Sequence, residues 1–397
     1  MSAGIYLHIP FCKSRCSYCD FATDVYRDNG AVERYVQALC SEIKGRTTCV
    51  SGWNEGHTHG VSSTVSTPPA NAGGSAFIDT IYFGGGTPSL LTPGQLERIL
   101  AAVHSEFDVA ANAEITMEMN PATVTPATLT AYRNFGINRA SFGVQTFDDR
   151  ALKLLARGHD ANDARQTFRL LRDAGYDNVS FDLIAGLPGQ TLESWSKNLD
   201  EAIAMSPEHL SLYLLEIHAG TPLAEQVSSG RQPQPDDELA AEMYELMLGR
   251  LAAAGYEQYE ISNFSRPGFE SRHNSKYWTL DPVYGFGVSA HSFDGTERYA
   301  NERDTAKYVE HIEAGKSSVI MREKPDIASE FIFLGLRLEA GIDLVRFRQR
   351  FGFDLVTRYR DEVDRLIDGG LLESENERLR LSLKGKLYSN EVFAVFV

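Results

Sequence analysis

The sequence predicts an α/β protein: a parallel (β/α) barrel or half-barrel followed by a small winged-helix-like domain. In the first 235 residues, short runs rich in β-branched and aromatic residues alternate with amphipathic helical patterns. Polar residues at successive strand ends (Glu118, Gln145, Asp182, Glu216) are 27, 37 and 34 positions apart, about one βα unit each. After about residue 320, helical stretches and a short hairpin replace this alternation.

The expected strands are short runs rich in β-branched and aromatic residues, as in a buried parallel sheet covered by helices. They are Gly4–Ile9, Ile78–Phe83, Glu114–Met119, Asn138–Val144, Asn178–Ile184 and His209–Leu215. A helix begins after Thr92, because Thr92 and Gln95 have capping-box spacing and Pro93 occupies the first helical position. Further helices are expected over Asp163–Ala174, Leu192–Ala204 and Asp236–Ala254. Six βα units are visible rather than eight, which indicates a partial (β/α)6 barrel.

The segment Gly45–Ala76 interrupts the pattern, since 20 of its 32 residues are Gly, Ser, Thr, Pro or Asn. We expect a flexible surface insertion. Its His57 and His59 are expected to be solvated polar residues rather than metal ligands.

The C-terminal part is expected to contain helices at Ile327–Leu338, Leu344–Phe351 and Leu355–Asp368, then a hairpin reaching Leu379–Leu383. Residues 321–397 contain 13 Lys and Arg against 14 Asp and Glu, so a packing or docking role is favoured over DNA binding. The whole chain has a net charge of −16, which also disfavours bulk nucleic-acid binding. We therefore expect a core at 1–235, an extension at 236–320 and a C-terminal domain at 321–397.

The N-terminal residues lack the basic and apolar regions of a signal peptide, and no run of 18 apolar residues is present. A cytoplasmic location is expected. Three of the five cysteines, Cys12, Cys16 and Cys19, lie within eight residues, whereas Cys40 and Cys49 stand apart. This distribution favours a metal or cluster site over a disulfide framework.

The spacing C-x3-C-x2-C follows the first expected strand directly. Structural zinc normally needs four closed ligands, and Cys40 lies 21 positions later on an expected helix. Three thiolates on a 4Fe–4S cluster instead leave one iron open. With Tyr18 before Cys19, the motif resembles the radical S-adenosylmethionine (SAM) superfamily, which implies a cluster, SAM and an electron donor.

Other conspicuous residues also lie at the ends of expected strands, where α/β barrels carry their sites. The second strand ends in Gly84-Gly85-Gly86-Thr87-Pro88, whose backbone could approach the ends of SAM closely. Any one of these residues could simply satisfy barrel-end hydrogen bonds. Six strand ends that converge on one mouth favour a ligand site.

Nearly the whole chain resembles one branch of that superfamily, the HemN and HemW group, starting at Tyr6-Leu7-His8-Ile9-Pro10-Phe11-Cys12. By resemblance, the SAM-binding positions are Tyr6, Gly85, Gly86, Thr87, Glu118, Gln145, Arg157 and Asp182. Glu216 and His291 also occupy such positions, in local contexts that match less closely.

Two features separate the branches of this group. The coproporphyrinogen dehydrogenase branch has a fourth cysteine where this chain has Phe21, and His273-Asn274-Ser275-Lys276-Tyr277-Trp278 is similar to the HNxxYW signature of the heme chaperones. The resemblance implies heme binding at His273, Asn274, Tyr277 and Trp278, with His273 as an axial ligand. The alternative for this segment is an aromatic core with a hydrogen-bonded histidine.

The resemblance thus implies a heme chaperone that binds a cluster, SAM and heme and transfers heme to an acceptor hemoprotein. Two alternatives stay open: an oxygen-independent coproporphyrinogen III dehydrogenase, and a radical SAM enzyme with another substrate. The sequence does not decide whether SAM is turned over, whether the protein forms a homodimer, or whether it contacts a membrane peripherally through the acceptor.

Overall fold

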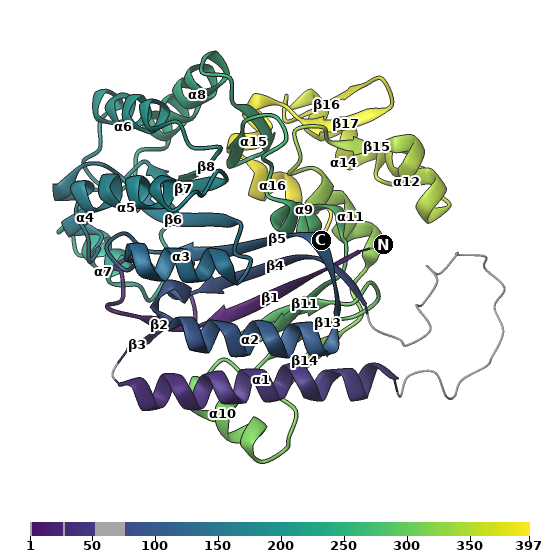
Figure 1. Ribbon diagram of the computed structural model, residues 1–397. Helices are drawn as coiled ribbons and strands as arrows, with labels where there is room; N and C mark the ends of the chain where they lie inside the picture. The colour runs from purple at the N-terminus through teal and green to yellow at the C-terminus, as the bar shows by residue number, and fades with distance from the viewer. Residues whose placement is uncertain (1, 27, 52–75) are drawn as a thin grey trace, which may run out of the picture.

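The computed structural model describes residues 2–26, 28–51 and 76–397. Within these residues, twelve strands form one curved sheet in the order β14-β13-β12-β11-β1-β4-β5-β6-β7-β8-β10-β9 (Figure 1). Its parallel centre consists of β1 (Ala3–Ile9), β4 (Phe77–Gly85), β5 (Asp108–Met119), β6 (Arg139–Gln145), β7 (Val179–Ala185) and β8 (His209–Leu214). The six predicted strands and the partial-barrel fold are confirmed.

Helices connect these strands and cover the outer face of the sheet (Figure 1). They are α1 (Asn29–Ser51), α2 (Pro93–Glu106), α3 (Pro126–Asn134), α4 (Asp149–Leu154), α5 (Ala161–Asp173), α6 (Leu192–Met205), α7 (Pro222–Ser228) and α8 (Asp237–Ala253). The capping box predicted at Thr92 is present. The Thr92 side chain accepts a hydrogen bond from the Gln95 backbone NH, and the Gln95 side chain accepts one from the Thr92 backbone NH. Ile5, Leu7 and Ile9 are completely buried beneath this helical layer.

Two boundaries differ from the prediction by six or seven residues, and the helix expected over Leu355–Asp368 is divided in two at Tyr359. Strand β5 begins six residues early, at Asp108, because its first half pairs with β4 although its residues are mostly polar or exposed. Helix α1 continues to Ser51, so the first seven residues of the expected insertion are helical. Once the amphipathic face from Val32 to Ile43 has nucleated the helix, each added residue costs little even for Gly and Thr. His57 and His59 lie outside the described residues.

The sheet also extends beyond both edges of the predicted half-barrel. On one side lie β11 (Val283–Phe286), β12 (His291–Phe293), β13 (Arg298–Asn301) and β14 (Val319–Glu323), and on the other β10 (Asn263–Ser265) and β9 (Glu257–Glu260). Strand β11 is parallel to β1, and β12, β13 and β14 continue the sheet antiparallel. These strands have three to five residues of mixed polarity, too short for a periodic signal. Helices α9 (Arg272–Thr279) and α10 (Thr305–Glu313) belong to the same region.

The C-terminal region has a separate hydrophobic core that includes Ile332, Phe347 and Leu379. Its elements are α11 (Ile327–Gly335), β15 (Ile342–Asp343), α12 (Leu344–Phe351), α13 (Leu355–Arg358), α14 (Arg360–Asp368), β16 (Leu372–Glu375), β17 (Arg378–Leu381), α15 (Leu383–Leu387) and α16 (Ser389–Phe393). Strand β15 joins the predicted hairpin to form a small sheet, which gives the winged-helix-like arrangement. The buried carboxylate of Glu260 pairs with Arg337 at 3.1 Å and ties this region to the barrel.

No helix in the part of the chain that the structure describes is long and apolar enough to span a bilayer.

Candidate cofactor site at the barrel mouth

The three clustered cysteines lie in the loop after β1, at the carboxyl ends of the parallel strands. Cys12 ends the short strand β2 (Phe11–Cys12), which pairs with β3 (Asp24–Val25). Ser17 fixes the loop to the end of α4, since its backbone NH donates to the Leu155 carbonyl at 3.0 Å and its hydroxyl to that of Leu154 at 2.9 Å. The three thiols are free and partly exposed.

Arg157 connects this loop to two strand ends. Its Nη2 donates to Asn120 Oδ1 and to the Gly143 carbonyl, both at 2.7 Å. Its Nη1 reaches Cys16 Sγ at 3.4 Å and the Tyr18 hydroxyl at 3.3 Å. A positive charge is therefore held beside the thiols by bonds to the protein scaffold.

Thr87 connects a second cysteine to the same scaffold. Its hydroxyl lies 3.6 Å from Cys12 Sγ and accepts from Asn120 Nδ2 at 2.8 Å. Asn120 thus bridges Thr87 and Arg157. It was not among the predicted site residues, although it follows Glu118 by two positions at the end of β5 and could have been found by that placement.

The three thiols and Cys40 differ in their surroundings. Burial raises the pKa of Cys12 and of Cys19, and the neighbouring thiols raise each further. Among the described residues no three His, Cys, Asp or Glu side chains converge closely enough to hold one metal ion. Cys40 lies on α1, where it packs against the outer hydrophobic core, so it is not positioned as a fourth zinc ligand.

Glu118 and Asp182 face the inside of the barrel below this loop. Glu118 accepts from the Tyr82 hydroxyl at 2.7 Å and from the Gly85 NH at 3.2 Å. Burial raises the pKa of Glu118 to about 7, and the neighbouring Asp182 contributes. Burial likewise raises the pKa of Asp182 to about 6, although the hydrogen bond from Ser211 acts to lower it. Both acids can therefore change charge near neutral pH.

The end of β6 is irregular. Its pairing with β7 shifts between Gly143 and Gln145, and Gln145 has a φ of 69°, unusual for a residue with a side chain. A Cβ at position 143 would collide with the Gln145 amide and lie 3.2 Å from the Arg157 guanidinium. Glycine at 143 thus allows both side chains to occupy the mouth.

Two strand ends approach each other closely at the glycine turn after β4. The Gly86 NH donates to the Ile9 carbonyl at 2.8 Å, and a Cβ at Gly86 would lie only 2.7 Å from the Pro10 backbone. Gly85 has a φ of 111°. The turn therefore needs glycine at both positions and directs its backbone toward Glu118.

The other predicted SAM positions lie in different places. Tyr6 stacks on Tyr82 inside the barrel, with ring centroids 6.2 Å apart. Glu216 lies beyond β8 and is exposed, 3.8 Å from His218, which in turn lies 3.7 Å from Asp20 in the cysteine loop. His291 is on β12 and, with Tyr277 of α9, lines a small cavity of about 30 Å³.

The segment His273–Trp278 lies on α9, at the other end of the barrel interior. His273 is completely buried and stacks on Tyr82 at 5.1 Å. Its Nδ1 shares a hydrogen bond with Thr80 at 2.9 Å, and its Nε2 with Tyr277 at 3.2 Å. Burial lowers its pKa to about 3, so the ring is neutral. These contacts are those of a hydrogen-bonded core histidine, which is the alternative to a heme ligand for this segment.

The rest of that segment contacts the C-terminal region. The Trp278 ring lies under the Arg337 guanidinium at 4.4 Å, and its Nε1 is buried without a partner among the described residues. Asn274 is half-buried, and its backbone NH is capped by Ser271 at 3.3 Å. Helix α9 therefore lies between the barrel and the winged-helix-like region.

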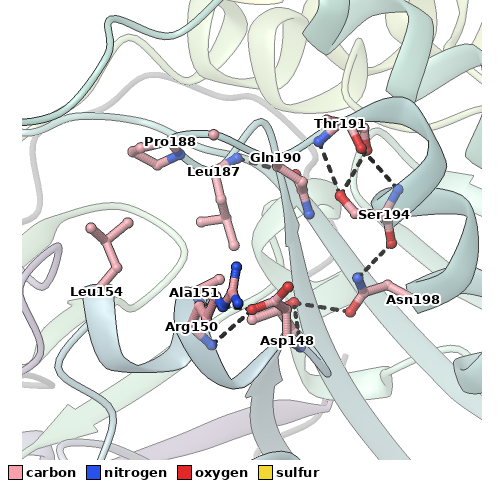
Figure 2. Close-up of a pocket in the computed structure, with 12 residues that line it drawn as sticks. Asp148, Arg150, Ala151, Leu154, Leu187, Pro188, Gln190, Thr191, Ser194 and Asn198 are labelled. Atoms are coloured by element: carbon pink, nitrogen blue, oxygen red, sulfur yellow. Dashed lines mark hydrogen bonds between the residues drawn. The ribbon is translucent and has the colours of Figure 1, made fainter.

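A larger cavity of about 330 Å³ lies between α4 and α6, beside the mouth (Figure 2). Leu187 and Leu154 form its apolar part, and Asp148, Ser194 and Asn198 its hydrogen-bonded polar part (Figure 2). Leu154 lines this cavity and its carbonyl also accepts from Ser17, so the cavity adjoins the element that holds the cysteine loop.

The fold and the cysteine loop together define a radical SAM protein. Residues 6–202 match the radical SAM superfamily, and residues 323–388 match the HemN C-terminal domain. The solved coproporphyrinogen III oxidase HemN of Escherichia coli has the same fold, with a TM-score of 0.83 and 22% identity over 100% of this chain and 90% of that one. Membership in the superfamily implies SAM and a 4Fe–4S cluster.

Sequence relatives specify the branch. The heme chaperone HemW of Bacillus subtilis is 32% identical, covering 99% of this chain and 98% of its own. HemW of Escherichia coli is 31% identical with the same coverage. A mouse mitochondrial protein named radical S-adenosyl methionine domain-containing protein 1 is 34% identical over 96% of this chain and 84% of its own. The chain belongs to the HemW family.

Proposed function

We propose that this protein is a heme chaperone, which binds heme and a SAM-ligated 4Fe–4S cluster and transfers heme to an acceptor hemoprotein. The observation that carries the proposal is the similarity to proteins named heme chaperone HemW along nearly the entire length of both chains. Phe21, 63% exposed at the position of the dehydrogenases' fourth cysteine, supports the same choice.

Cys12, Cys16 and Cys19 would hold the cluster. When bound, such a cluster supplies one electron for the cleavage of SAM, and an external electron donor would reload it. The hydroxyl of Thr87 and the guanidinium of Arg157 would bind the polar ends of SAM, since they contact two of the thiols. The backbone of Gly85 and Gly86, in the turn just before Thr87, would contribute to the same site. Glu118, Gln145 and Asp182 would accept from its hydroxyl or ammonium groups, and Tyr6 would lie beneath them.

Heme would bind beside α9, because this helix carries the HNxxYW segment and lines a small cavity together with residues of β11 and β12. We also propose that the chain is divided into domains at residues 235 and 320. The intervening part would carry heme, and the C-terminal region would meet the acceptor. A cytoplasmic site of action belongs to the same proposal.

The experiment is an anaerobic reconstitution with iron and sulfide, followed by two assays on the same preparation. In the first, the heme-loaded protein is mixed with an apo-hemoprotein, and transfer is followed by the absorbance of the acceptor. In the second, SAM, a reductant and coproporphyrinogen III are added, and products are separated. Heme transfer without protoporphyrinogen supports the proposal. Rapid protoporphyrinogen formation would establish the dehydrogenase instead.

A further inference from the structure

We propose that Arg139, inside the barrel, is a positioning residue for SAM, whose unpartnered guanidinium keeps the carboxyl groups of Glu118 and Asp182 negatively charged. The inference rests on the proposed function, since it concerns how SAM would be held. It goes beyond that function by giving a role to the first residue of β6, at the end of the strand farthest from the cysteine loop.

The side chain of Arg139 is directed into the barrel, on the same face of the sheet as Glu118. The next residue, Ala140, packs in the outer hydrophobic core, so Arg139 points the other way. Arg139 is directly opposite Thr116 of β5, and Thr116 precedes Glu118 by two positions on the inward face. The diagonal neighbour of Arg139 toward the mouth is therefore Glu118, within reach of a long side chain.

Asp182 lies on the other side of Arg139, also nearer to the mouth. The inward residues of β6 that follow Arg139 are Ser141 and Gly143, and Gly143 is directly opposite Asp182. Neither Ser141 nor Gly143 carries a long side chain. The guanidinium can therefore extend along the inside of β6 toward both acids.

The guanidinium of Arg139 has no bonded counter-ion. The side chain is 1% exposed, and within the residues that the structure describes no hydrogen bond or ion pair to it is present. Its Nε is buried without a partner, and so is the hydroxyl of Thr116 beside it. A buried charge that no bonded partner neutralises acts on groups farther away, because the protein interior screens charges weakly.

Arg139 opposes the effect of burial on both acids. Burial raises the pKa of Glu118 to about 7 and that of Asp182 to about 6, and the charge of Arg139 acts to lower both. Arg157 also lowers the pKa of Asp182. Its guanidinium, however, is bonded to the mouth residues and to Cys16, whereas that of Arg139 is not.

The other ionisable groups that interact with these acids stay uncharged near neutral pH. They are tyrosines whose pKa burial raises, namely Tyr6, Tyr82 and Tyr277 around Glu118, and Tyr18, Tyr82 and Tyr213 around Asp182. The histidines near Arg139, His209 and His273, are neutral because burial lowers their pKa. The ionisation of the two acids therefore depends on each other's charge and on the two arginines.

The charge of the acids matters because SAM carries a sulfonium and an ammonium group against one carboxylate. An ionised carboxyl attracts this net positive ligand, whereas a protonated one does not. Without Arg139 a larger fraction of both acids would be protonated at pH 7, and SAM would bind more weakly.

The test is isothermal titration with SAM of the full-length protein, reconstituted anaerobically, at pH 6, 7, 8 and 9. The variants are Arg139→Gln, Arg139→Lys and, as the matched control, Arg169→Gln, which removes an exposed arginine of α5. We expect Arg139→Gln to bind SAM about 5 to 10 times more weakly than the wild type at pH 7, and at least as tightly at pH 9, where both acids are ionised without help. Arg139→Lys and Arg169→Gln should follow the wild type. The ratio of two affinities at each pH removes the titration of SAM itself, whose amino group titrates alike in every sample.

A second comparison places Arg139→Gln in a Glu118→Gln/Asp182→Asn background, where no buried acid is left unpaired by the loss of the arginine. There the substitution should leave the SAM affinity unchanged. A loss of affinity in that background, equal affinities of wild type and Arg139→Gln at pH 7, or a deficit that is the same at every pH would overturn the inference. A reconstituted wild type that binds no SAM at any pH would instead overturn the proposed function, so the two failures are distinguishable.

Discussion

Arg157 donates from its Nη1 to the sulfur of Cys16 at 3.4 Å, although the two residues are 141 positions apart in the chain. The same guanidinium is fixed by Asn120 and by the Gly143 carbonyl, so its position is set by β5 and β6 rather than by the loop. A buried cation of this kind orients the thiolate loop and supplies a partner for an anionic group of SAM.

We therefore predict that Arg157→Gln binds SAM about 10 to 100 times more weakly than the wild type, because a charge-assisted hydrogen bond contributes about 1.5 to 3 kcal/mol. Isothermal titration of the reconstituted protein with SAM measures this. Arg150→Gln is the matched control, since Arg150 is exposed on the neighbouring helix α4. Equal losses in both variants would contradict a specific role for Arg157.

The cysteine-to-alanine variants should form two groups that differ in the amount of bound iron. Replacing Cys12, Cys16 or Cys19 with Ala removes one of three thiol ligands, and we expect each variant to lose the charge-transfer absorbance and nearly all of the bound iron. Cys40→Ala should retain both, because Cys40 packs on α1 against the outer core. Iron analysis after reconstitution checks the difference, and iron retention by Cys16→Ala would refute the three-ligand site.

His273 should matter for stability. His273→Ala removes two buried hydrogen bonds and a stacking contact with Tyr82, and leaves Thr80 without its partner. We expect a loss of roughly 2 to 4 kcal/mol in the free energy of unfolding. His291→Ala should change it by less than about 0.5 kcal/mol because His291 is exposed. Urea denaturation of the cofactor-free proteins compares them, and equal stabilities for both variants would argue against a core role.

The sequence predicted most of the site residues at the strand ends but few of the hydrogen bonds that join them. Cys12 and Glu118 could be found because they lie at or just after the end of an expected strand, and Asp182 because it is the acidic residue within one. The bonds of Asn120 could not be predicted, since they depend on which strand lies beside which. The burial of His273 depends on Thr80, 193 positions away, and no local pattern carries that information. Strands β11 to β14 were missed because each is held mainly by its neighbours in the sheet.

The carboxyl of Glu118 gives a prediction about pH. Its pKa in the folded protein is raised to about 7, from an ordinary value near 4.5, mainly by burial. A raised pKa means that the folded state binds the proton more tightly than the unfolded state. The stabilising contribution is therefore complete below about pH 4.5 and is lost as the pH rises through 7.

For the cofactor-free protein we expect this single group to lower the free energy of unfolding by roughly 2 to 3 kcal/mol between about pH 4.5 and pH 8. Glu118→Gln keeps an acceptor for the Tyr82 hydroxyl and the Gly85 NH but cannot ionise. Because Asp182 titrates in both proteins, the difference between them isolates Glu118. Urea midpoints measured from pH 5 to pH 8 should diverge, the wild type losing stability relative to Glu118→Gln. Parallel curves, or a wild type that gains stability with rising pH, would mean that Glu118 is already ionised in the folded protein.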